Sequence, residues 1–159
     1  MINEHPAVPR HAGFWIRLVA DFLDSGALTV VSWVLEYAVL GVIYWVWSFT
    51  QPEPVPGLLK AFDPLMIQVL NIGIYMSLSF PYYVIGHMKY GTTFAKRLFR
   101  IYVVNQGDLG ALTMRQSIVR YLAYFVSALP LGAGYTMAGF HPEKRALHDL
   151  IAGTSCIRR

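Results

Sequence analysis

The pattern of hydrophobic and polar positions divides the chain into three long apolar stretches, of which the first, residues 12–49, is the longest. This stretch contains four charged residues: Arg17, Asp21, Asp24 and Glu36. The roughly 25 residues that follow Asp24 contain a single charge, and a helix of that length can cross the hydrocarbon core of a bilayer. We therefore predict a transmembrane helix over residues 12–49, preceded by a flexible polar arm over residues 1–11.

A second apolar stretch over residues 64–88 predicts a second transmembrane helix, for which Pro64 suits the first turn. Pro81 removes a backbone hydrogen bond in the last third of this helix, which predicts a kink. The connecting residues 50–63 contain three closely spaced prolines, a single lysine and no arginine. They are therefore expected to form an extended loop outside the cytoplasm.

Residues 89–113 contain Lys89, Lys96, Arg97 and Arg100, which place this segment in the cytoplasm by the positive-inside bias. Phe94, Leu98 and Ile101 repeat at helical spacing and predict a short amphipathic helix on the membrane surface. Residues 101–104 then have the composition of a strand, which could pair with residues 155–158.

The third apolar stretch, residues 114–140, has basic residues at both of its ends. The positive-inside bias would place both ends in the cytoplasm, which one straight helix cannot satisfy. Pro130 and Gly132 lie in the middle of the stretch, where the chain could turn back. We expect a broken, re-entrant third element followed by a cytoplasmic tail over residues 141–159. A single span with an outside tail is the alternative.

Composition agrees with a single all-α integral membrane domain over residues 1–159. Hydrophobic residues make up 55% of the chain and charged residues only 14%, against about 25% charged in a soluble domain. The net charge of +4 comes from residues beside apolar stretches, so it indicates membrane orientation and not nucleic-acid binding. Cys156 is the only cysteine and the five histidines lack metal-ligand spacing, so we expect no metal and no cofactor.

Three sequence motifs, in order along the chain, resemble those of the RDD family of small prokaryotic membrane proteins. They are Ala12-Gly-Phe-Trp-Ile-Arg17-Leu-Val-Ala-Asp21-Phe-Leu-Asp24, Gly91-Thr-Thr-Phe-Ala-Lys96-Arg97 and Leu147-His-Asp149-Leu-Ile-Ala-Gly153. The resemblance implies that the arginine and two aspartates of the family name are Arg17, Asp24 and Asp149. Ala95 stands where the family usually has glycine. Transport, including cation/proton exchange, has been proposed for some members.

Seven charged residues are candidates for an ion or proton site, or for a structural charge network: Arg17, Asp21, Asp24, Glu36, Lys96, Arg120 and Asp149. Arg17, Asp21 and Asp24 lie at i, i+4 and i+7, on one face of the first helix. Asp24 lies about 13 Å deeper than Trp15 by helix rise, where a carboxylate must be neutral, paired or hydrated. It could serve as the ion site or form an ion pair with Arg120 or Lys96.

The other candidates also have two interpretations each. Arg17 could brace Asp21 locally or bind Asp149 through two parallel hydrogen bonds. Glu36 points about 120° away from Asp24 around the helix, so it should meet another helix or another subunit. There a hydrogen bond from its protonated form is favoured over a proton-carrying role.

Two functions follow from these observations. The chain could be a small transporter or cation/proton exchanger that works as an oligomer. Alternatively, it could be a non-catalytic accessory subunit of a larger membrane complex. No catalytic motif accompanies His148 and Asp149, so we expect them to form a helix-start cap and a salt bridge, and we expect no enzyme activity. The expected partners are membrane lipid and either further copies of the chain or other membrane proteins. The expected location is the bacterial inner membrane, with both termini in the cytoplasm.

Overall fold

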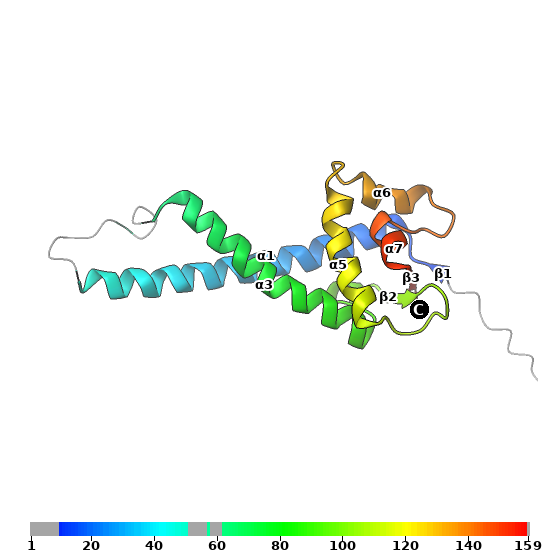
Figure 1. Ribbon diagram of the computed structural model, residues 1–159, viewed down its shortest axis with the longest axis horizontal. Coiled ribbons are helices and arrows are strands. Elements are labelled where there is room, and N and C mark those ends of the chain that lie inside the picture. Colours follow the sequence, from blue (N-terminus) through cyan, green and yellow to red (C-terminus); the bar gives the residue numbers. More distant parts are fainter. Residues whose placement is uncertain (1–9, 51–56, 58–61, 159) are drawn as a thin grey trace, which may run out of the picture. The chain divides into compact units, whose positions relative to one another are not determined.

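The computed structural model describes residues 10–50, 57 and 62–158 (Figure 1). The helices are α1 (Phe14–Ser48), α3 (Pro64–Tyr90), α4 (Phe94–Leu98), α5 (Met114–Ala128), α6 (Ala133–Phe140) and α7 (Leu147–Ala152). The strands are β1 (Arg10–His11), β2 (Ile101–Asn105) and β3 (Thr154–Arg158). The chain forms two compact units. The two-helix unit is Ser25–Phe80, and the sheet-containing unit comprises the described residues of Met1–Asp24 and Pro81–Arg159.

Helices α1 and α3 are both long and apolar enough to cross a membrane, as the hydrophobic pattern predicted. Large apolar side chains are exposed along both helices, which suits a lipid environment and would be unfavourable in water. Trp15 and Trp45 are exposed, as interfacial anchors would be. Pro81 lies within α3, and the division between the two units falls at this residue.

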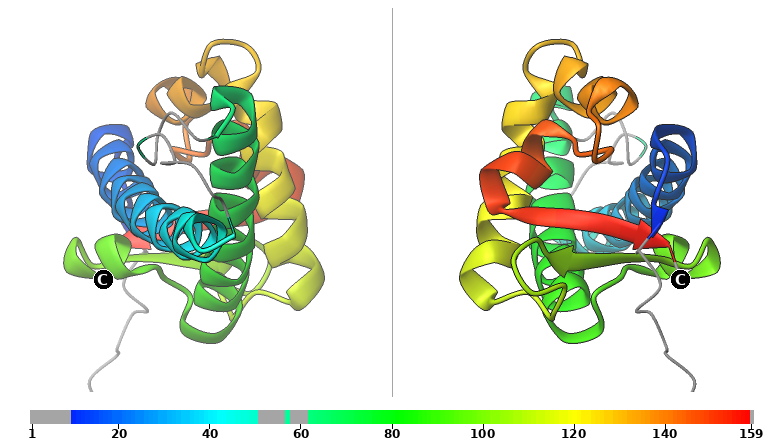
Figure 2. Two further views of the ribbon diagram at one scale, coloured as in Figure 1. Left: turned by 90° about the vertical axis from the view of Figure 1, so that its left-hand side faces the viewer. Right: turned by 90° about the vertical axis from the view of Figure 1, so that its right-hand side faces the viewer.

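A small antiparallel sheet of three strands in the order β1-β3-β2 belongs to the sheet-containing unit (Figure 2). The predicted pairing of residues 101–104 with 155–158 is confirmed, with Tyr102 opposite Ile157. Because it contains this sheet, the fold is mostly helical and not all-α. The strand β1 was not predicted, and the flexible-arm prediction is wrong for Arg10 and His11, which form it. The two residues of β1 form a strand only through their pairing with β3. A segment of two residues is too short to show the alternation of apolar and polar side chains that predicts a strand.

The third apolar stretch forms two helices, α5 and α6, separated by a turn. Leu131 and Gly132 both adopt positive φ there, at 50° and 80°, which ends the helical path after α5. The two helices approach closely at Gly134, where a Cβ atom would lie 2.6 Å from Cα of Ser127. The chain therefore turns back near Pro130, but entry of this helical pair into a membrane stays a prediction.

The short helix α4 ends at Leu98, before the expected amphipathic repeat is complete. Arg100 adopts a φ of 57°, which takes the backbone out of the helix and into β2. Ile101 consequently lies fully buried in the sheet and not on a helix face. Phe94 and Leu98 remain exposed on one side of α4, while Ala95 and Lys96 are buried on the other. The position of α4 on a membrane surface stays a prediction.

Candidate functional site

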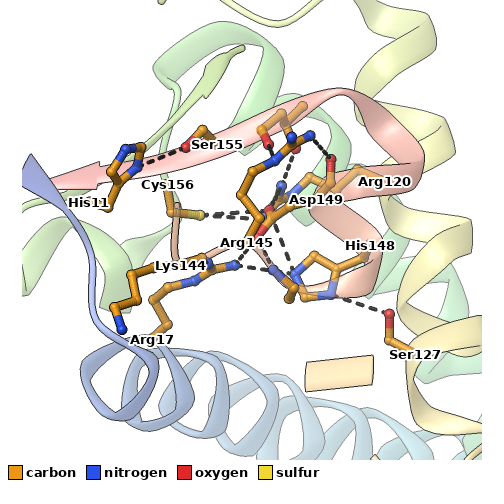
Figure 3. A network of polar contacts seen from close by, with 12 residues as sticks. His11, Arg17, Arg120, Ser127, Lys144, Arg145, His148, Asp149, Ser155 and Cys156 are labelled. Carbon is orange, nitrogen blue, oxygen red and sulfur yellow. Dashed lines mark hydrogen bonds and ion pairs between the residues drawn. The ribbon is translucent and has the colours of Figure 1, made fainter. Parts of the chain in front are cut away.

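Asp149 is shared by two buried arginines that come from distant parts of the chain (Figure 3). Arg17 on α1 donates to Oδ2 of Asp149, and Arg120 on α5 donates to Oδ1. Asp149 and Arg120 have no exposed surface, and Arg17 is 4% exposed. Oδ2 also accepts the N–H of Ala146 at 3.0 Å, so the same carboxylate caps the start of α7. The predicted roles of Asp149 as helix cap and salt-bridge partner are both present.

The same arginines also bind the backbone and side chains of the C-terminal segment. Nη1 of Arg17 donates to the carbonyl of Lys144 at 2.7 Å, and Nη1 of Arg120 donates to Oγ1 of Thr154 at 2.5 Å. Charge-assisted hydrogen bonds of this kind are about twice as strong as neutral ones. The network therefore fastens α7 and β3 to α1 and α5.

Burial and charge act in opposite directions on Asp149. Burial alone would raise its pKa, but the guanidinium groups of Arg120 and Arg17 hold the pKa well below its usual value. Asp149 is therefore ionised at neutral pH. For the adjacent His148, burial lowers the pKa well below its usual value, so the ring is neutral. Its ring nitrogens lie 3.4 Å from Nη2 of Arg17 and 3.4 Å from Oγ of Ser127.

Asp24 forms a second site in the sheet-containing unit and accepts hydrogen bonds from three donors. Its Oδ1 accepts the hydroxyl of Tyr82 at 2.5 Å and the N–H of Ala95 at 2.9 Å, and its Oδ2 accepts the hydroxyl of Thr93. Thr93 is the N-cap residue that immediately precedes α4, and its own side chain makes no capping hydrogen bond. Asp24 therefore caps α4 from α1, far away in the sequence.

The expected ion pair between Asp24 and Arg120 or Lys96 is not what the structure contains. Arg120 pairs with Asp149, and Lys96 pairs with Asp21 at 2.7 Å. The local brace between Arg17 and Asp21 is likewise replaced, because Arg17 turns to Asp149. Hydroxyl and backbone donors satisfy Asp24 instead of a cation, and no pattern of charges in the sequence could indicate them.

Lys96 is a buried cation that an aromatic cluster surrounds. Its Nζ lies 6.0 Å and 5.8 Å from the ring centroids of Tyr83 and Tyr124, and 3.3 Å from the hydroxyl of Tyr124. Cation–π attraction and the Asp21 ion pair together offset the loss of hydration of this ammonium group. Ala95 and Lys96 lie on the buried side of α4, so this part of the middle motif is involved in packing.

Glu36 belongs to the two-helix unit and is separate from these networks. It is 3% exposed, and its Oε2 accepts a hydrogen bond of 2.6 Å from Nδ2 of Asn71 on α3. The expectation that Glu36 meets another helix is therefore confirmed. Its second oxygen, Oε1, has no hydrogen-bond partner among the described residues. Glu36 is thus a buried acid of which one oxygen is hydrogen-bonded and the other is not, within the part of the chain that the structure describes.

Sequence reasoning missed the tyrosine and threonine partners of the charged residues and the buried His87. Both ring nitrogens of His87 lack a hydrogen-bond partner in the described part of the chain. The ring of His148 packs against the ring of Tyr124, with 4.5 Å between the ring centroids. Thr93 lies inside the second motif, which was the available signal for its involvement. Within the described ranges, no group of three or more metal-binding side chains is gathered together.

Two helices long and apolar enough to span a membrane, joined to a small unit with a buried charge network, indicate a small, mostly helical, membrane-like protein. The RDD family model matches residues 11–153, and the chain belongs to the RDD family. It is 30% identical to the uncharacterized protein YxaI of Bacillus subtilis, covering 92% of this chain and 96% of that protein. It is 32% identical to the uncharacterized protein YckC of the same organism, with coverage of 90% and 82%. No solved structure matches the chain.

Proposed function

We propose that this protein is a small cation/proton exchanger of the bacterial inner membrane, in which Glu36 is the exchanging carboxylate. The observation that supports this proposal is the oxygen Oε1 of Glu36, which is buried and has no hydrogen-bond partner among the described residues, while Oε2 is bound by Asn71 of the neighbouring helix. An ionisable group inside a membrane helix is costly, and such groups commonly belong to ion or proton pathways. The hydrogen bond from Asn71 to Oε2 orients the carboxyl group of Glu36. The other oxygen, Oε1, could then accept a proton or a cation.

The charge networks of the sheet-containing unit are proposed to have a structural role. Asp149 and Asp24 are buried and are each fully engaged with several donors, so neither offers an open coordination position. A carboxylate shared by two guanidinium groups would have to break both ion pairs to take up a proton. The proposed ion site is therefore Glu36 and not Asp24, which the sequence also offered as an ion site. The proposal involves no covalent chemistry and no enzymatic step.

An oligomer is part of the proposal, because two or three membrane elements rarely enclose a pathway by themselves. The large apolar side chains exposed along α1 and α3 provide surfaces on which further copies could pack. The same exposed surfaces favour the second candidate function, a non-catalytic accessory subunit that packs against a larger membrane complex. For both functions we propose that the termini lie in the cytoplasm, because the C-terminal tail is basic.

Reconstituted transport tests the exchanger directly. The wild-type protein, in proteoliposomes with an internal pH dye, should release protons when Na⁺ or K⁺ is added outside. Glu36→Gln keeps the size and the hydrogen bond to Asn71 but cannot exchange a proton, so it should reduce this flux at least about tenfold. Glu143→Gln is the matched control, because Glu143 is an exposed acid of the sheet-containing unit, and its flux should equal that of the wild type.

Two results would contradict the proposal. Wild-type protein that moves neither cation nor proton under any gradient would eliminate the exchanger and leave the accessory subunit. A Glu36→Gln variant that transports normally would show that another group carries the proton. Size-exclusion profiles of both variants must match the wild type, so that a loss of flux cannot be assigned to a loss of folding or assembly.

A further inference from the structure

A groove in the sheet-containing unit lies where α3 ends and α4 begins. It encloses about 350 Å³, which is within the range of small-molecule sites in proteins. The lining residues come from the last turns of α3 and from the connection to α4: Pro81, Tyr82, Ile85, Gly86, Tyr90, Thr92, Thr93 and Phe94. Ile85, Tyr90 and Phe94 are also exposed at the surface, so the apolar groove opens onto an apolar rim.

Basic residues flank the groove-lining residues along the sequence, and the same stretch of sequence contains no acid. Residues 64–107 contain four cations and neither Asp nor Glu. Lys96 is buried and paired with Asp21, which leaves Lys89, Arg97 and Arg100 exposed. Nζ of Lys89 lies 5.7 Å from the ring centroid of Tyr90, and Tyr90 forms part of the groove wall. An apolar groove next to exposed cations suits a ligand that is both apolar and anionic.

We propose that this groove binds one anionic phospholipid of the surrounding bilayer, with an acyl segment against Pro81 and Ile85 and the phosphate toward Lys89 and Arg97. The groove adjoins the end of a helix that can span the membrane, where lipid headgroups and aromatic side chains meet. The exposed Phe94 and Leu98 face of α4 extends the apolar rim beyond the groove. Polybasic segments beside membrane helices attract anionic lipid in this way.

A second copy of the chain is a poorer occupant of the groove. A symmetric contact would bring two sets of Lys89, Arg97 and Arg100 together, and like charges at an interface oppose association. The bound lipid would also lie next to Tyr82 and Thr93, whose hydroxyl groups hold Asp24. Lipid in the groove would thus cover one side of the α4 cap. This site does not depend on whether Glu36 carries protons.

Lipid binding to delipidated full-length protein in detergent, followed by native mass spectrometry, tests the proposal. Phosphatidylglycerol should bind at least about tenfold more tightly than phosphatidylcholine of the same acyl chains. The double variant Lys89→Gln/Arg97→Gln should lose about fivefold in affinity per cation for phosphatidylglycerol alone. Ile85→Trp, which fills the groove, and Phe94→Ala, which removes a wall at an exposed position, should weaken both lipids. Arg115→Gln, an exposed cation on α5, is the control and should change neither.

Three outcomes would overturn the proposal. Equal affinity of the wild type for the two lipids would remove the anionic headgroup from the site. Loss of binding in the double variant with full binding in both Ile85→Trp and Phe94→Ala would indicate a headgroup contact at the surface without an acyl segment in the groove. Tighter binding of a poly-glutamate peptide than of phosphatidylglycerol would point to an acidic protein partner instead. Elution profiles and melting curves like those of the wild type are required of each variant.

Discussion

Replacing Asp149 by Asn removes the single negative charge that two buried guanidinium groups share. Arg17 and Arg120 would keep their positions but lose the anion that offsets their dehydration. Removing one partner of a buried ion pair costs about 3–5 kcal/mol. The asparagine oxygen can still accept the N–H of Ala146, so the loss of the helix cap adds little to this cost. We expect the free energy of unfolding of Asp149→Asn to fall by about 3–5 kcal/mol.

Thermal unfolding in detergent, followed by tryptophan fluorescence, measures this effect. A loss of about 3–5 kcal/mol corresponds to a melting temperature at least about 10 °C lower for a chain of this length. Glu143→Gln is the matched control, because Glu143 lies 3.5 Å from Arg145 but its side chain is 49% exposed. Exposed ion pairs contribute about 0–1 kcal/mol, so this variant should melt close to the wild type.

A double-mutant cycle isolates the pair between Arg17 and Asp149. Arg17→Gln and Asp149→Asn should each destabilise the protein, and the double variant should be more stable than the sum predicts by about 1–3 kcal/mol. Exchanging the two charges should not restore stability, because an arginine at position 149 would face Arg120. Strict additivity, or an Asp149→Asn variant that melts like the Glu143→Gln control, would refute the structural role assigned to this network.

Two further predictions concern His148 and Asp24. Burial lowers the pKa of His148, so the unfolded chain binds a proton below pH of about 6.5 while the folded protein does not. The stability linked to His148 is therefore complete above that pH and falls below it by up to about 1.4 kcal/mol per pH unit. Melting temperatures measured from pH 7.5 to 5 should decline more steeply for the wild type than for His148→Gln, and parallel profiles would contradict a neutral buried ring. Asp24→Asn should cost about 1.5–3 kcal/mol by weakening three charge-assisted hydrogen bonds, and should speed amide exchange at Ala95. Its cation flux per folded molecule should equal that of the wild type, and loss of flux in folded protein would return the ion site to Asp24.

Regular helix geometry explains which parts of the site could be predicted from the sequence. Arg17 and Asp24 lie on one helix face by their spacing, and both are buried in the sheet-containing unit, as charged groups on a membrane helix should be. Arg17 was also correctly proposed to reach Asp149, since guanidinium and carboxylate groups pair well. These inferences need only the helical repeat and the cost of exposing charge to lipid.

The choice of partner among several equivalent residues could not be predicted in the same way. Lys96 and Arg120 were both available to Asp24 by charge, but the fold brings them to Asp21 and Asp149. Tyr82 and Thr93 became the partners of Asp24 because the chain turns between α3 and α4, and hydroxyl groups carry no charge pattern. The bounds of the six-residue helix α7 were not predicted, because its capping acceptor, Asp149, lies inside the helix at its third residue.

Arg17, Asp24 and Asp149, which the resemblance to the family implies as its named residues, each fix a remote segment to the first helix or to its partner. Arg17 on α1 holds Asp149 and the carbonyl of Lys144, while Asp24, two turns further along α1, holds the first turn of α4. Each contact ties a segment that is remote in sequence to the first helix, and all of them lie within the sheet-containing unit. Side chains engaged in this way stabilise the fold of the unit. Glu36, the acid with an open oxygen, belongs to the other unit and to none of the three motifs. Under the proposed function, the motifs therefore account for the architecture of the sheet-containing unit, and ion exchange depends on a residue outside them.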